Sequence, residues 1–124
     1  MYDMKLVSEI LGQIYDALEK IKQRTANIAS ADYFTDSSEG AEKLDGVCML
    51  FLAVGESLKK VDRMTDGKLL ARYPGIDWKG TIGFRDVIAN QYFDIDAEQV
   101  YWICSHHVEP LSETIKLMIF DLQR

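Results

Sequence analysis

Residues 3–26, DMKLVSEILGQIYDALEKIKQRTA, carry the pattern that decides the fold. Apolar side chains recur along this stretch at spacings of four and three residues, which places them on one face of a helix. They are Leu6, Ile10, Ile14, Leu18 and Ile21. We therefore expect a long amphipathic helix over residues 3–26, with this stripe turned toward a core.

A second apolar helix follows after a segment rich in turn residues. Residues 30–40, SADYFTDSSEG, predict a loop. Residues 38–62 then predict a helix with Ser37 or Ser38 as its N-cap, and Leu44, Val47, Cys48, Phe51, Leu52, Gly55 and Leu58 line one of its faces. A glycine inside a helix costs about 1 kcal/mol relative to alanine. We therefore interpret Gly55 as the place where a neighbouring helix approaches closely.

The C-terminal half predicts three more helices. Residues 64–75 indicate an irregular connection with one helical turn at 68–72, and Asp77 then caps a helix over about 78–91. Asp96 and Gln99 fit the capping box of a fourth helix. Pro110 interrupts the pattern and is expected to open a fifth helix after a kink or break.

These elements predict an all-α protein. No alternation typical of strands persists, and the chain has only two prolines, so we expect an antiparallel bundle of four to five helices with more than about 60% helix. A length of 124 residues suits a single domain over residues 1–124.

The composition limits the expected cellular location of the protein and the partners that it can bind. The longest apolar run, residues 47–54, is far shorter than the roughly 18 residues of a membrane helix, and the N-terminus lacks a signal-peptide pattern. We therefore expect a cytoplasmic protein with no membrane contact. The net charge of −6 argues against non-specific binding of nucleic acid, but it does not exclude a local basic cleft. The two cysteines are far apart, which predicts reduced thiols, and nothing indicates a cofactor.

The candidate chemistry lies within residues 78–102, WKGTIGFRDVIANQYFDIDAEQVYW. Arg85 and Asn90 are five residues apart on the predicted helix, and Tyr92 follows its end. An arginine fork can hold a phosphate, an amide gives directional hydrogen bonds, and a phenol gives a stacking face for a base. The alternative is a surface ion pair of Arg85 with Asp86 or Asp94 beside a half-buried tyrosine.

The run IGFRDVIANQYFDID at residues 82–96 resembles the signature of HepT-like proteins of the HEPN superfamily. Pro74, Ile76 and Trp78 upstream, and the GES at residues 55–57, extend the resemblance over essentially the whole chain. The family motif is an arginine, a polar residue after it, a histidine five residues after the arginine, and a tyrosine two further on. Arg85, Asp86 and Tyr92 match this motif, whereas Asn90 stands at the histidine position.

The resemblance implies a homodimer in which two motif copies face each other across a cleft and form a metal-independent endoribonuclease site. By this resemblance Arg85 and Asn90 occupy the catalytic positions, and Arg85, Asp86 and Tyr92 contact RNA. Such proteins are toxins encoded beside a minimal nucleotidyltransferase, the antitoxin, which transfers AMP to the motif tyrosine, here Tyr92. A dimer is also expected because a short bundle leaves Tyr92, Phe93, Tyr101 and Trp102 partly uncovered, and aromatic residues favour interfaces.

Asn90 bears directly on the chemistry. Asparagine has no proton that titrates near neutrality and cannot act as a general base, and losing acid–base help costs roughly 100- to 10,000-fold in rate. Two functions therefore stay open: a ribonuclease of reduced activity, and a catalytically silent module that binds a nucleotidyltransferase partner or RNA through the same cleft. His106 and His107 are interpreted as helix-terminal residues, and Asp94, Asp96 and Glu98 as acids at a helix N-terminus, so we expect no metal site.

Overall fold

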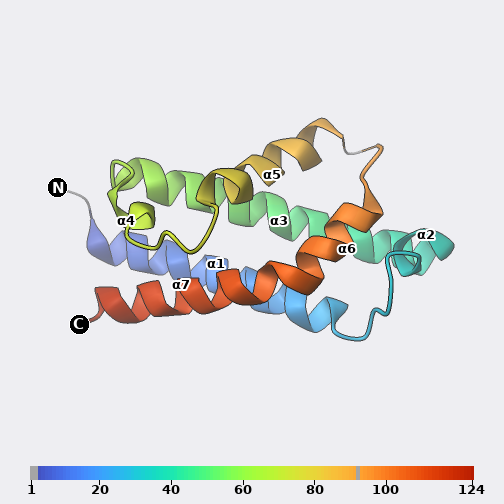
Figure 1. Cartoon of the computed structure of the whole chain (residues 1–124), viewed down its shortest axis with the longest axis horizontal. Helices are drawn as coiled ribbons and strands as arrows, with labels where there is room; N and C mark the ends of the chain where they lie inside the picture. Colours follow the sequence, from blue (N-terminus) through green and yellow to red (C-terminus); the bar gives the residue numbers. More distant parts are fainter. Residues whose placement is uncertain (1–2, 92) are drawn as a thin grey trace.

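The computed structural model describes residues 3–91 and 93–124 and is 79% helical, with no strand in these two ranges. In the described part of the chain, five long helices and two single-turn helices follow one another (Figure 1). They are α1 (Met4–Thr25), α2 (Tyr33–Asp36), α3 (Ser38–Met64), α4 (Lys68–Ala71), α5 (Trp78–Asn90), α6 (Ala97–His106) and α7 (Val108–Leu122). The predicted all-α class is confirmed.

The core lies between α1, α3 and α7. In Figure 1, α1 runs antiparallel to both α3 and α7, and it packs against each of them. The buried face of α1 includes most of the predicted stripe, namely Ile10, Ile14, Leu18 and Ile21. Leu6 was assigned to this stripe but is 39% exposed, because Val7 and Leu11 take the inward positions in the first two turns.

The segment predicted as a loop at residues 30–40 contains a helical turn. Phe34 is only 1% exposed, and its burial anchors α2 against α3. Helix α3 then begins at Ser38, where the Ser37 hydroxyl accepts a hydrogen bond from the Gly40 amide at 3.0 Å. This cap is one of the two serines that the sequence offered.

The break between the last two helices lies at His107, not at Pro110 as predicted. Helix α6 ends at His106 and α7 begins at Val108, so Pro110 sits in the first turn of α7. A proline fits there because the amide hydrogens of a first turn have no partner within the helix. Figure 1 shows α6 leaving the line of α7 at this break.

Helix α5 lies at the side of the bundle. The Asp77 carboxylate caps it by accepting a hydrogen bond from the Gly80 amide at 3.0 Å, as predicted. Its main neighbour is α3, and Ile88 is its fully buried residue. The polar positions of α5 therefore depend on α3 for their placement. No helix in the described ranges is long and apolar enough to span a membrane.

Candidate functional site

Gly55 sets the distance between α3 and α5 at Arg85. A Cβ atom added at Gly55 would lie 2.6 Å from the Cβ of Arg85 and 3.3 Å from its Cγ. Carbon atoms in contact prefer about 3.5–4.0 Å, so no larger residue fits without moving α5. The predicted close approach at Gly55 is confirmed, and the helix that approaches is the one that carries the motif arginine.

The Arg85 guanidinium is held by two carboxylates. Its Nε lies 2.6 Å from an oxygen of Glu56 on α3, and its Nη1 lies 2.8 Å from an oxygen of Asp86. The Arg85 side chain is one-third exposed. Of the two ion pairs considered from the sequence, the one with Asp86 is present. Glu56 was not assigned a role, although it belongs to the GES segment already noted.

This arrangement leaves little positive charge for an anion. The Arg85 guanidinium contacts the carboxylates of both Glu56 and Asp86, so these three side chains together carry a net negative charge. Within residues 3–91 and 93–124, no ion pair or hydrogen bond engages Nη2 of Arg85. That nitrogen can donate a charge-assisted hydrogen bond to a phosphate oxygen.

Asn90 lies at the C-terminal end of α5. Asn90 is its last residue and is exposed. Five residues of helix place Asn90 about 7.5 Å further along the axis than Arg85. Tyr92, assigned to RNA contact and AMP transfer, lies outside the described residues. Its neighbours Gln91 and Phe93 are both exposed.

The aromatic residues expected at an interface differ in exposure. Phe93 is 87% exposed and Trp102 is 58% exposed, with the Trp102 ring stacked on His106 at 4.7 Å between centroids. Tyr101 is instead half-buried, and its hydroxyl donates a hydrogen bond to the Ala29 carbonyl at 2.9 Å. Tyr101 therefore ties α6 to the segment that follows α1, whereas Trp102 is mostly exposed.

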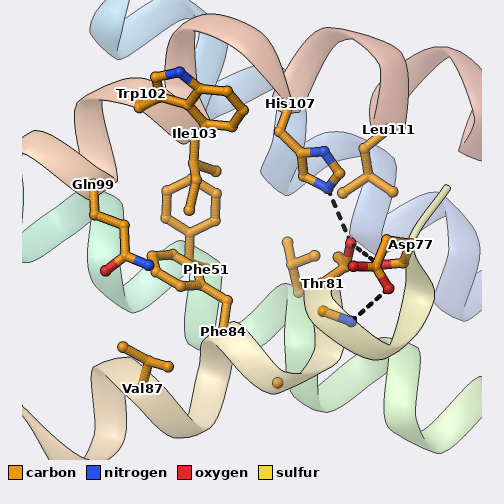
Figure 2. Close-up of a pocket in the computed structure, with 13 residues that line it drawn as sticks. Phe51, Asp77, Thr81, Phe84, Val87, Gln99, Trp102, Ile103, His107 and Leu111 are labelled. Carbon is orange, nitrogen blue, oxygen red and sulfur yellow. Dashed lines mark hydrogen bonds between the residues drawn. The ribbon is translucent and has the colours of Figure 1, made fainter.

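A cavity of about 480 Å³ separates α5 from the α6–α7 corner (Figure 2). Its walls are mainly apolar and aromatic, with the side chains of Phe51, Phe84, Trp102 and Ile103 around the middle. At one end the His107 Nε2 lies 2.9 Å from the Thr81 hydroxyl, beside Asp77. Burial lowers the pKa of His107, and the nearby Asp77 only partly opposes this. The sequence identified His107 as helix-terminal but did not indicate the cavity.

The all-α bundle and the arginine-centred motif on α5 define a helical domain of the HEPN type. A family model described as HepT-like, Ribonuclease HepT-like, matches residues 14–118, which include α5 and its motif. The chain belongs to the HepT-like ribonuclease family. No solved structure matches the chain.

Proposed function

We propose that this chain is the endoribonuclease toxin of a toxin–antitoxin pair and cleaves RNA without a metal ion at a cleft between two copies. Its activity is weakened by Asn90, which stands where the family motif has histidine. The main observation behind the proposal is the position of Arg85 on α5. Gly55 has no Cβ atom, so α5 can approach α3 closely at Arg85, and the Glu56 carboxylate binds the guanidinium there. Membership of the HepT-like ribonuclease family supports the class of activity.

In this proposal Arg85 binds the scissile phosphate through Nη2 and stabilises the charge that develops on it during transesterification. Glu56 acts as a positioning residue, because its contact with Nε fixes the direction of the guanidinium. Asn90 hydrogen-bonds to the phosphate or a base edge, but it cannot accept the 2′-hydroxyl proton near neutral pH. Asp86 lines the same site, and Tyr92 contacts RNA and is the residue to which the antitoxin transfers AMP.

A second copy of the chain completes the site. One subunit places a single arginine against two carboxylates, which is a poor site for a polyanion. Two copies facing each other bring a second Arg85 to the same phosphate backbone. The exposed Phe93 and Trp102 supply apolar surface for such an interface. Light scattering at tens of micromolar is expected to give the mass of a dimer, and a monomeric mass would contradict this part of the proposal.

The second candidate is a catalytically silent module that uses the same cleft to bind a nucleotidyltransferase or RNA. Two observations favour it: the absence of a titratable group at position 90 and the neutralisation of Arg85 by Glu56 and Asp86. A nucleotidyltransferase encoded beside this chain would support a toxin–antitoxin pair under either candidate. Cleavage of RNA decides between them.

The decisive experiment compares purified wild type, Asn90→His, and the double variant Asn90→His with Arg85→Ala on labelled RNA. Histidine restores a group that titrates near neutrality, so cleavage should rise about 100-fold or more. Asn90 is exposed, so the substitution should leave the thermal unfolding temperature nearly unchanged. Removing Arg85 should abolish the gain, because the phosphate loses its charged partner.

Two results would revise the proposal. Strong cleavage by wild type that Asn90→Ala does not reduce would show that position 90 takes no part in the chemistry. A folded, dimeric Asn90→His variant that cleaves no RNA would favour the binding module instead. The matched control is Gln91→His, because Gln91 is the exposed neighbour just beyond the motif position and should bring no gain.

A further inference from the structure

The cavity beside α5 has the size of a small-molecule site. Its volume of about 480 Å³ lies in the range of such sites, about 300–1,000 Å³. Each of the helices α3, α5, α6 and α7 contributes to the walls. Gly83 also lines it, and a Cβ atom added there would meet nothing within 4 Å. The open volume therefore extends to the backbone of α5.

The walls favour a flat ring. Phe51 and Phe84 meet edge to face, with ring centroids 5.5 Å apart and planes at 80°. Trp102 lies on the other side of the opening (Figure 2). Aromatic side chains bind flat ligands by offset stacking and edge contacts, and their faces also attract cations.

The polar residues select the charge of the ligand. Among the residues that the structure describes, the lining contains no lysine or arginine, and its one carboxylate belongs to Asp77. Asp77 Oδ1 accepts the capping hydrogen bond from Gly80, and within the described ranges Oδ2 has no hydrogen-bond partner. Burial lowers the pKa of His107, which disfavours its charged form. An anionic ligand such as a nucleotide phosphate is therefore disfavoured here, unlike at Arg85.

We infer that this cavity binds a small aromatic amine, with its ring among Phe51, Phe84 and Trp102 and its amino group donating to the Asp77 carboxylate. Thr81 and His107 flank that end of the cavity, where the Thr81 hydroxyl and His107 Nε2 are hydrogen-bonded to each other. None of these side chains belongs to the motif at Arg85, Asp86, Asn90 and Tyr92, although Trp102 also contributes to the surface proposed for the dimer.

The experiment measures binding of tryptamine and of indole-3-propionate to the full chain by calorimetry and by shifts in amide NMR signals. The two probes share an indole ring and differ in the charge of the end group. Tryptamine is expected to bind about five- to tenfold more tightly and to shift the signals of residues around Thr81, Phe84 and Trp102. Asp77→Asn should remove this preference and keep the helix cap, since asparagine caps as well as aspartate.

Filling the cavity supplies a second, independent test. Gly83→Leu should weaken tryptamine binding at least tenfold, whereas Gly12→Leu should not, although Gly12 is also a helical glycine with open space at its Cβ position. Equal affinity for both probes, or no binding of tryptamine, would overturn the inference. It would also be overturned if Gly83→Leu converted a dimer to a monomer, because a second copy would then occupy the cavity.

Discussion

Replacing Gly55 with alanine tests how the motif arginine is placed. The added Cβ would lie 2.6 Å from the Arg85 Cβ, about 1 Å inside normal contact, so α5 must shift away from α3. Overpacking of this kind costs about 1–3 kcal/mol, while the gain in helix propensity from glycine to alanine returns about 1 kcal/mol. The net change in the free energy of unfolding is therefore about 0–2 kcal/mol of destabilisation.

Gly46→Ala is the matched control. Gly46 lies on the same helix, and a Cβ there would meet only the tip of the Arg24 side chain at 4.0 Å. The propensity gain is common to both variants, so their difference isolates the clash and should be about 1–3 kcal/mol. Urea unfolding followed by circular dichroism measures it. If Gly55→Ala were as stable as Gly46→Ala, the close approach of α5 would not be what Gly55 provides.

Three further predictions concern other residues. In the Asn90→His background, Glu56→Ala should lower RNA cleavage about 10- to 100-fold, because Arg85 loses the carboxylate that aligns it. Glu56→Gln should keep part of the activity, and Glu42→Ala on the exposed face of α3 should have no effect. An equal loss in the Glu42 variant would refute a positioning role for Glu56. Burial lowers the pKa of His107 below its ordinary value of 6.5, so the unfolded chain binds more protons. The contribution of His107 to the free energy of unfolding should thus be fully present above pH 6.5 and decrease as the pH falls below it. His107→Gln should flatten this pH dependence in urea titrations between pH 5 and 7.5. Burial raises the pKa of Cys48 to about 11 and of Cys104 to about 12, which keeps both thiols in their unreactive protonated form. Both should react with Ellman's reagent at pH 7.5 much faster in denaturant than in the native protein. Comparable rates would show that the fold does not protect the thiols.

Helix positions could be predicted because hydrophobic periodicity and capping are local properties of the sequence. The expected helix over residues 38–62 appears as α3, and Asp77 and Asp96 cap α5 and α6 as predicted. The break at His107 could not be placed in the same way. Proline forbids only certain helical positions, and the direction in which α6 leaves α7 is decided by packing at their corner.

The residues of the candidate site also differ in whether the sequence could indicate them. Arg85, Asp86 and Asn90 lie on one helix, but it was the resemblance to the HepT-like motif that assigned them to a common site. Glu56 is 29 residues away and reaches Arg85 only because α3 and α5 touch at Gly55. The cavity was invisible in the sequence for the same reason, since its walls come from four helices and no local pattern marks an empty volume.

The sparse burial of α5 also bears on how this chain can evolve. Most of the core is formed by α1, α3 and α7, and Ile88 is the fully buried residue of α5. Exposed positions such as Asn90 can therefore change with little selection from folding. A lineage can lose and regain a titratable side chain at such a position through single substitutions without losing the fold. Active and silent copies of one such scaffold can in this way persist side by side.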